Sequence, residues 1–458
     1  MAERLNVILV VLDGARADHL SCYGHARETT PFLDQVAREG VRFSSMIATA
    51  PSTLPAHASL FTGLYAATHG ATDENRFLWA QHQTLPEQLK AAGYRTAAFC
   101  TAPWVGPETG FGRGFDAFFT QRYHNRVAAR AILYGRKASD TLLRRNDSGA
   151  RRTNQALRRW LAASEQPFFA FVHYNETHLP FAPPRPYDRM FLPRGVTEAR
   201  VRTVNQDSNK YLARQLDMSE EDFAILASLY DGGLRYVDTR LREMADFLRA
   251  QGQWDRTLFI VTGDHGESLG EHATMGHKSV LYDTVLRVPL LLRCPARVPR
   301  GFVVDELAQT TDLMPTILRM VDVPEDAGKL EGRPLLQDGH ATPGPGFAIS
   351  ECFRPNLAAF QRRFPECDVR GLDVRKKAIR TKREKFVWQS DEANELYDLV
   401  ADAGERNNLI EREPVRADRL RRQLFDWLAS VEKFEGEGQP PEMGAVISAQ
   451  LRALGDVE

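Results

Sequence analysis

Two apolar segments that each lead into an aspartate constrain the fold of this chain most. Residues 7–12 read Val-Ile-Leu-Val-Val-Leu and are followed by Asp13, and residues 257–262 are followed by Gly263 and Asp264. A continuous apolar run of this length is typical of a strand buried on both faces of a parallel sheet. The carboxyl ends of such strands lie at one edge, where open α/β sheets place their sites. We therefore expect two acidic strand ends at one sheet edge.

Predicted helices and strands alternate along the first 262 residues. Proline in the first turn and glycine after the last turn mark the ends of the two earliest helices. The predicted helices cover residues 31–39, 85–92, 151–163 and 220–251, and the further predicted strands cover residues 41–43, 94–99 and 167–174. This alternation predicts an α/β fold with a doubly wound, mostly parallel sheet.

A second, smaller unit is expected at the C-terminal end. Residues 339–346 are rich in proline and glycine, which is typical of a linker. Short antiparallel strands are expected at residues 347–350, 377–381 and 385–388, and a closing amphipathic helix at residues 413–431. We therefore predict a catalytic α/β domain over residues 1–340 and an α+β subdomain over residues 345–458.

The composition argues against several classes of protein. The 59 basic and 60 acidic residues nearly cancel, so no global field favours nucleic acid or an anionic membrane. The 5 cysteines are scattered without a CxxC pair, which argues against a disulfide framework and a structural zinc site. No apolar run approaches the roughly 18 residues that a membrane span requires, and the first one is too short for a signal peptide. We expect a cytoplasmic protein that has no membrane anchor and does not bind nucleic acid.

Basic residues are concentrated between Arg122 and Arg159, where only Asp140 and Asp147 oppose them. The segment could cradle an anionic substrate. A solvated helical face whose charge is compensated by acidic neighbours is the favoured interpretation.

Four stretches carry the candidate chemistry: residues 11–18, 53–63, 263–267 and 276–278. Each alone could be a helix cap or a tight turn. In this order, and together with residues 168–181, 230–232, 287–290 and 395–399, they resemble the sulfatase branch of the alkaline phosphatase superfamily almost from end to end. The resemblance implies an alkaline-phosphatase-like α/β/α sandwich with a mostly parallel sheet.

The chain departs from the sulfatase pattern at the nucleophile. Sulfatases oxidise the Cys or Ser that begins a Cys-x-Pro-x-Arg signature to formylglycine, but here that position is Thr53 and the Arg position is His57. A threonine, with its methyl group on Cβ, could yield at most a ketone, so the hydrated-aldehyde mechanism is excluded. The second of the paired N-terminal aspartates is Gly14, and the Asp-Asn of many sulfatases is Asp264-His265. These features resemble the phosphoethanolamine transferases and lipoteichoic acid synthases, membrane-anchored enzymes that use a metal-bound threonine on phosphodiesters.

The resemblance implies one tightly bound divalent cation, with Asp13, Thr53, Asp264 and His265 as its ligands. Such a cation would lower the pKa of the Thr53 hydroxyl, and an imidazole ligand favours Mn²⁺ or Zn²⁺ over Ca²⁺ or Mg²⁺. The family positions that stabilise transition-state charge are matched by His178, His277 and Lys278, and either histidine could protonate the leaving oxygen. The sequence leaves open whether a second, weakly bound ion lies at His178 and His277.

Several neighbouring side chains are ambiguous in the sequence. Glu267 is expected to orient His265 rather than to bind metal. The remaining histidines could bond or pack around the pocket, and these are His57, His69, His173 and His272.

These features predict a metal-dependent hydrolase of phosphodiesters or phosphomonoesters with a phosphothreonine intermediate. One alternative is a sulfatase-family enzyme that cleaves sulfate esters without formylglycine. The other is a non-catalytic protein that binds a phosphorylated or sulfated ligand. The expected partner is a small-molecule phosphate or sulfate ester, and a homo-oligomer is compatible with the sequence.

Overall fold

The computed structural model describes residues 4–120, 147–163, 167–325, 330–355 and 357–434. Nine strands form the large sheet in the order β11-β2-β10-β6-β1-β5-β3-β4, with β9 paired to β2. They are β1 (Asn6–Leu12), β2 (Val41–Ile47), β3 (Arg95–Cys100), β4 (Ala117–Thr120), β5 (Phe168–Tyr174), β6 (Thr257–Gly263), β9 (Arg287–Val288), β10 (Leu290–Arg293) and β11 (Phe302–Gln309). Central strand β1 pairs in parallel with β5 and β6, whereas β10 runs antiparallel to β6 and β2. The predicted α/β class with a mostly parallel sheet is confirmed.

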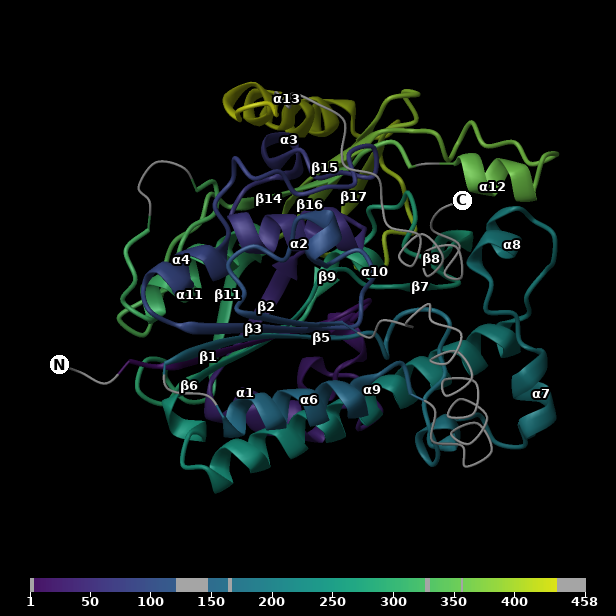
Figure 1. Cartoon of the computed structure of the whole chain (residues 1–458). Coiled ribbons are helices and arrows are strands. Elements are labelled where there is room, and N and C mark those ends of the chain that lie inside the picture. Colours follow the sequence, from purple (N-terminus) through teal and green to yellow (C-terminus); the bar gives the residue numbers. More distant parts are fainter. Residues whose placement is uncertain (1–3, 121–146, 164–166, 326–329, 356, 435–458) are drawn as a thin grey trace.

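Helices cover both faces of this sheet (Figure 1). Alternate residues of β1 enter two separate cores, Val7, Leu9 and Val11 in one and Ile8, Val10 and Leu12 in the other. The first core includes α2 (Thr53–Thr62), α4 (Leu85–Ala91) and α11 (Leu313–Met320), and the second includes α1 (Pro31–Glu39), α6 (Ala150–Ala162) and α9 (Glu220–Ala250). Because neither face of the central strands meets water, their sequences are apolar throughout rather than alternating.

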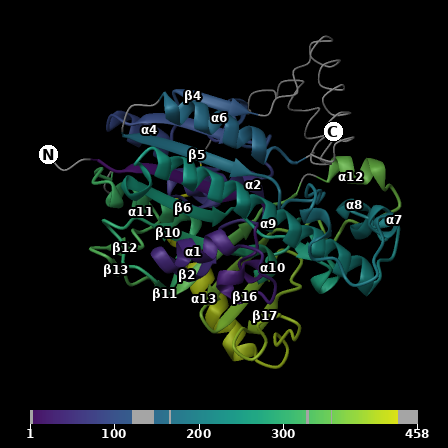
Figure 2. The ribbon, with the colours of Figure 1, turned by 90° about the horizontal axis from the view of Figure 1, so that it is seen from below.

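A smaller antiparallel sheet follows in the chain. It contains β14 (Phe347–Cys352), β15 (Lys376–Thr381), β16 (Glu384–Gln389) and β17 (Glu395–Asp398) in that order. Helix α13 (Pro414–Ser430) packs on it around Ile349, Ile379, Phe386 and Leu420, and Figure 2 shows both at the same end of the molecule. These elements are the predicted α+β subdomain.

The structure describes the predicted linker and part of the arginine-rich segment. The predicted linker begins inside a short hairpin, β12 (Leu336–Gln337) with β13 (His340–Ala341). Of the arginine-rich segment, residues 121–146 lie outside the described residues, and the rest includes the amphipathic helix α6. Further short elements are α3 (Ala66–His69), β7 (Ser268–Leu269), β8 (Met275–Gly276), α7 (Glu198–Thr203), α8 (Ser208–Leu212), α10 (Asp283–Leu286) and α12 (Ala358–Arg363).

Among the helices that the structure describes, none is both long enough and apolar enough to traverse a bilayer.

Candidate active site

Two buried aspartates meet at the carboxyl edge of the large sheet. Strand β1 delivers Asp13 and β6 delivers Asp264, because Leu12 is in register with Gly263. Asp264 Oδ1 accepts hydrogen bonds from the backbone N–H groups of Gly14 (3.2 Å) and His265 (2.9 Å). Asp13 Oδ1 and Asp264 Oδ2 are buried and accept no hydrogen bond from any described residue. The edge therefore offers two carboxylate oxygens suited to a cation.

The nucleophile candidate lies opposite this edge. Thr53 is the first residue of α2 and is 6 % exposed. Its Oγ1 lies 3.2 Å from His265 Nε2. The positive end of the helix dipole would favour negative charge on this oxygen.

His265 presents one ring nitrogen to the two aspartates. Its Nδ1–H donates to the carbonyl of Gly266 (3.0 Å), and its Nε2 lies 3.5 Å from Asp13 Oδ1 and 3.6 Å from Asp264 Oδ2. A histidine that donates one N–H to a backbone carbonyl and turns the other nitrogen toward carboxylates has the usual arrangement of a metal ligand. The candidate ligand atoms of Asp13, Asp264 and His265 all lie within 4.8 Å of one another. These residues fit a divalent cation.

The position of the missing second aspartate is sterically closed. Gly14 has φ +73°, and a Cβ atom there would lie 2.8 Å from the carbonyl oxygen of Thr177 and 2.9 Å from Glu267 Cγ. Both distances are shorter than Cβ contacts in folded proteins. No carboxylate can therefore reach the cation site from residue 14 without movement of the surrounding chain.

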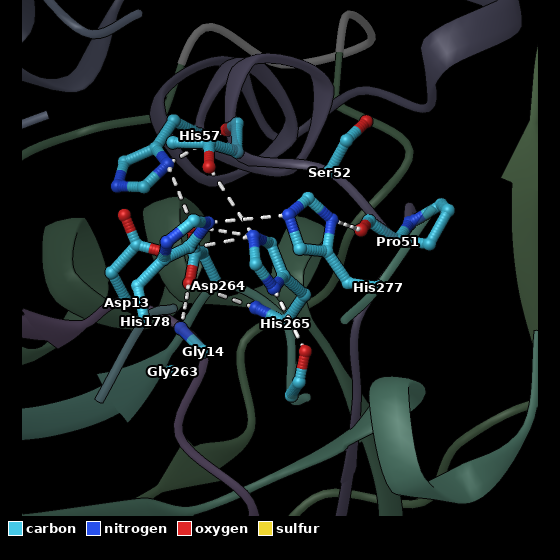
Figure 3. Close-up of polar contacts among 12 residues, drawn as sticks. Asp13, Gly14, Pro51, Ser52, His57, His178, Gly263, Asp264, His265 and His277 are labelled. Atoms are coloured by element: carbon cyan, nitrogen blue, oxygen red, sulfur yellow. Dashed lines mark hydrogen bonds and ion pairs between the residues drawn. The ribbon is translucent and has the colours of Figure 1, made fainter. Parts of the chain in front are cut away.

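His178 and His277 face each other beside this centre (Figure 3), with their Nε2 atoms 3.2 Å apart. His178 Nδ1 donates to the carbonyl of Leu179 (2.6 Å), and His277 Nδ1 donates to the carbonyl of Pro51 (2.8 Å). Because each Nδ1 carries its hydrogen, both Nε2 atoms present lone pairs. Two facing lone pairs require a proton or a cation between them.

Glu267 lies beside the His178–His277 pair, whereas the sequence analysis expected it to orient His265. The expectation that Glu267 orients His265 is wrong, since the carbonyl of Gly266 does so. Glu267 Oε1 lies 3.8 Å from His277 Nε2, and neither carboxylate oxygen accepts a hydrogen bond from the described part of the chain. Burial raises the pKa of Glu267 to about 7, although the neighbouring His178 and His265 oppose the shift.

Two further histidines lie on the interior side of the aspartates. His57 Nδ1 donates to the carbonyl of Thr53 (2.8 Å) and lies 3.6 Å from Asp264 Oδ2. His173 Nε2 lies 3.3 Å from Asp13 Oδ2. Burial lowers the pKa of His57 to about 4, so this ring is neutral where the sulfatase signature has a charged arginine.

The other two ambiguous histidines take different positions. His69 Nε2 bonds to the Ser59 hydroxyl (3.1 Å) within the helical layer, and His272 stacks on Tyr282 with ring centroids 3.7 Å apart.

Lys278 lines the same pocket as Thr53, His178 and His277, and its Nζ lies 3.5 Å from Asn209 Oδ1. Thr53, His178, His277 and Lys278 therefore line one pocket. His265 lies next to Thr53, with Asp13 and Asp264 beside it.

Comparisons with known proteins agree with this architecture. The sulfatase family model matches residues 5–323. An uncharacterized sulfatase of Escherichia coli K12, YidJ, is 27 % identical over 450 residues, which cover 93 % of this chain and 86 % of that protein. PehA of Trinickia caryophylli, a multifunctional alkaline phosphatase superfamily protein, is 27 % identical over 396 residues, covering 73 % of this chain and 76 % of PehA.

A solved structure shows the same fold. The phosphonate monoester hydrolase of Agrobacterium radiobacter superposes with a TM-score of 0.77 at 24 % identity, over 93 % of this chain and 96 % of that one. With a family model matching more than half of its length and the strand-end aspartates in place, the chain belongs to the sulfatase family, within the alkaline phosphatase superfamily.

Proposed function

We propose that this protein is a divalent-cation-dependent hydrolase of phosphate esters with Thr53 as its covalent nucleophile. The observation that carries the proposal is the position of the Thr53 hydroxyl, at the start of α2 and 3.2 Å from the nitrogen that His265 turns toward two buried carboxylates. A nucleophilic hydroxyl next to a cation site is the arrangement that phosphoryl transfer to an enzyme side chain requires.

The cation would be held by Asp13, Thr53, Asp264 and His265. When bound, it supplies a Lewis acid that lowers the pKa of the threonine hydroxyl and offsets charge on the phosphoryl oxygens. The imidazole among the ligands favours Mn²⁺ or Zn²⁺.

The residues of the chain carry the two chemical steps. Thr53 Oγ1 forms a bond to phosphorus while the bond from phosphorus to the leaving oxygen breaks, and the electron pair of that bond leaves with the oxygen. The proton that Thr53 gives up reaches the leaving alcohol through the His178–His277 pair. Water then attacks the phosphorus of the phosphothreonine and the bond to Thr53 Oγ1 breaks. The product is phosphate from a monoester or a phosphomonoester from a diester, and a proton from the water restores the Thr53 hydroxyl. Lys278 supplies positive charge to the equatorial oxygens during both steps.

The His178–His277 pair can hold a weakly bound second cation in place of a proton. The support is the 3.2 Å separation of the two Nε2 atoms and the nearby buried carboxylate of Glu267. Metal titration is expected to give one tight and one weak equivalent per chain, and Glu267→Gln should lose only the weak one.

The relatives support both kinds of ester. The phosphonate monoester hydrolase is named for phosphorus chemistry and PehA for the alkaline phosphatase superfamily, whereas YidJ is named a sulfatase. Hydrolysis of sulfate esters is therefore the second candidate, favoured by family membership. Threonine at the nucleophile position argues against it, because the formylglycine route is closed.

The test is a substrate panel with one leaving group. Initial rates would be compared for 4-nitrophenyl phosphate, bis(4-nitrophenyl) phosphate, 4-nitrophenyl phenylphosphonate and 4-nitrophenyl sulfate. We expect a phosphorus ester to be hydrolysed fastest, and Thr53→Ala to lose at least about 10³-fold in rate. The matched control is Thr62→Ala at the far end of α2, whose hydroxyl donates to the carbonyl of Ala58 (2.7 Å). Preference for the sulfate, or full activity of Thr53→Ala, would overturn the proposal.

A further inference from the structure

The backbone of Asp13 is fixed from two sides. Its N–H donates to the carbonyl of Tyr174 (2.9 Å), and its carbonyl accepts from the Thr177 hydroxyl (2.6 Å). Its carboxylate oxygen Oδ1 lies 3.5 Å from His265 Nε2 and accepts no hydrogen bond from any described residue. Because the main chain is fixed, the rotation of the carboxylate decides which of its oxygens faces the cation site.

The other oxygen of this carboxylate faces His173. Asp13 Oδ2 lies 3.3 Å from His173 Nε2. His173 is on β5 in register with Val11, two residues before Asp13, and it is fully buried. The carboxylate therefore lies between two imidazoles, with one oxygen toward each.

Thr101 determines the tautomer of His173. The Thr101 hydroxyl oxygen lies 3.0 Å from His173 Nδ1 and 3.2 Å from the carbonyl oxygen of His173. A lone pair on His173 Nε2 would face a buried carboxylate oxygen and be repelled by it, so the hydrogen of the neutral ring belongs on Nε2. Nδ1 then accepts from the Thr101 hydroxyl, and the ring directs an N–H at Asp13 Oδ2.

The same contacts argue against a metal ion on this interior side. His57, His173 and Asp264 bring candidate ligand atoms within 4.8 Å of one another. The His57 atom that faces Asp264 Oδ2, at 3.6 Å, is Nδ1, which donates its hydrogen to the Thr53 carbonyl (2.8 Å). His173 Nε2 also carries a hydrogen. A ring nitrogen that carries a hydrogen has no lone pair for a metal, so these two rings direct N–H groups at the carboxylates in this arrangement.

We infer that His173 is a positioning residue for the cation: its Nε2–H holds Asp13 Oδ2 and thereby presents Asp13 Oδ1 to the cation. His173 itself supplies no ligand. This role rests on the proposed function, which places a divalent cation at Asp13. Residues that orient a metal ligand in this way change metal affinity by about 10–100-fold when they are removed.

Substitutions at His173 separate the donor from the shape of the side chain. Mn²⁺ dissociation constants would be measured by calorimetry, without substrate, on the full-length protein freed of metal with a chelator. His173→Phe keeps an aromatic ring and removes the N–H, so we expect about 10–100-fold weaker binding. His173→Gln places an amide N–H near the position of Nε2 and should recover most of the affinity.

Thr101 supplies a second pair of variants outside the fully buried core. Thr101 is half-buried, directly after β3. Thr101→Val removes the hydroxyl that fixes the tautomer and should weaken Mn²⁺ binding, whereas Thr101→Ser keeps the hydroxyl and should bind as the unaltered protein does. This pair decides the question if His173→Phe fails to fold.

The matched control is Phe169→Leu. Phe169 is fully buried on the same strand and in the same core as Phe171, in register with Val7 and farther from Asp13. The substitution should lower the free energy of unfolding and leave the Mn²⁺ dissociation constant unchanged, because it disturbs packing alone. Unchanged affinity in His173→Phe, an equal loss in His173→Gln, or equal affinities of Thr101→Val and Thr101→Ser would overturn the inference. An equal loss in Phe169→Leu would do the same.

These measurements also distinguish the role of His173 from the proposed function. No substrate is present, so a failure to hydrolyse phosphate esters leaves the difference between His173→Phe and His173→Gln measurable. If the unaltered protein bound no divalent cation, both the proposed function and the role of His173 would be wrong. Equal binding by the unaltered protein and His173→Phe would contradict the role of His173 alone.

Discussion

Gly14 limits which side chains could reach a cation at the candidate site. Its backbone has φ +73°, and any Cβ would meet the Thr177 carbonyl and Glu267. We predict that Gly14→Asp, which restores the sulfatase sequence pattern, weakens metal binding instead of strengthening it, because the new side chain displaces Asp13 or Glu267. Metal affinity and thermal unfolding of the variant would be measured together. Tighter metal binding by a normally folded Gly14→Asp protein would contradict the steric account.

Mutations should distinguish the cation ligands from the residues that stabilise charge in the transition state. Asp264→Ala is predicted to lose both bound metal and activity, because Asp264 Oδ2 is a buried carboxylate oxygen at the strand ends that no described residue hydrogen-bonds. Lys278→Ala should lose activity, by about 10²-fold or more, with metal retained. Elemental analysis of the purified variants beside their initial rates is the measurement. Stoichiometric metal in an active Asp264→Ala protein would show that the ligand assignment is wrong.

The sequence predicted those residues that follow strands or match a motif, and it missed contacts made by folding. Asp13 and Asp264 follow apolar strands, so their position at one edge followed from the parallel sheet. Glu267 contacts His277 only because β7 and β8, strands of two residues each, pair as a hairpin that brings residues 267 and 277 together. No periodicity marks such a short hairpin, and the position of His57 against Asp264 likewise depends on how α2 packs on the sheet.

At the scale of elements, a buried ion cluster joins helix α9 to the turn after β1. Asp231 on α9 is 1 % exposed, and its carboxylate lies 2.7 Å from His19 Nδ1, 3.2 Å from His25 Nε2 and 2.8 Å from Arg27 Nη1. Burial acts to raise the pKa of Asp231, but the hydrogen bonds from His19 and His25 hold it at about 2, below the usual 3.8. The ionised carboxylate therefore stabilises the fold.

This cluster predicts a pH-dependent stability. The contribution of Asp231, about 2 kcal/mol from the pKa shift, is fully present above pH 4 and is lost as the pH falls toward 2. Asp231→Asn should lower the free energy of unfolding at pH 7 by at least that amount, and the difference from the unaltered protein should shrink at pH 3. The control is Asp246→Asn on the same helix, whose carboxylate pairs with Arg249 and is 61 % exposed. A difference between Asp231→Asn and the unaltered protein that stays constant from pH 7 to pH 3 would contradict the assignment.

Elements with a clear apolar run or helical periodicity were readable from the sequence, and several others were not. Strands β1, β5 and β6 and helix α9 match their predicted ranges within two residues, since apolar runs and helical periodicity mark them. The antiparallel strand β10 and the short strand β9 follow each other within residues 287–293, and their pairing with β2 depends on contacts more than 200 positions apart in the chain.

At the scale of the whole molecule, buried charges connect the small sheet to the catalytic part. Lys385 on β16 is fully buried, and its Nζ lies 2.7 Å from both Asp283 Oδ1 and Glu405 Oε1. Arg380 on β15 pairs with the other oxygen of Asp283 (2.9 Å). Asp283 begins α10 in the catalytic part, so this network fixes the subdomain that contributes Cys352, Phe360 and Leu372 to the pocket lining.

Removing a charge from this network should lower the free energy of unfolding. We predict that Lys385→Met lowers the free energy of unfolding by about 3–5 kcal/mol, because it leaves two buried carboxylates with less compensation. Lys382→Met, which removes a half-exposed pair with Glu306 (3.3 Å), should cost at most about 1 kcal/mol. Chemical denaturation of the two variants is the measurement, and equal stability of the two would contradict the account.

The central claim is that Thr53 carries the phosphoryl group during turnover. The most direct measurement is mass spectrometry of enzyme that is quenched in acid during hydrolysis of a phosphate ester and then digested. We predict a phosphoryl adduct on the peptide that contains Thr53, its persistence in the partly active Thr53→Ser enzyme, and its loss in Thr53→Ala together with activity. Turnover without an adduct, or an undiminished rate in Thr53→Ala, would contradict the claim.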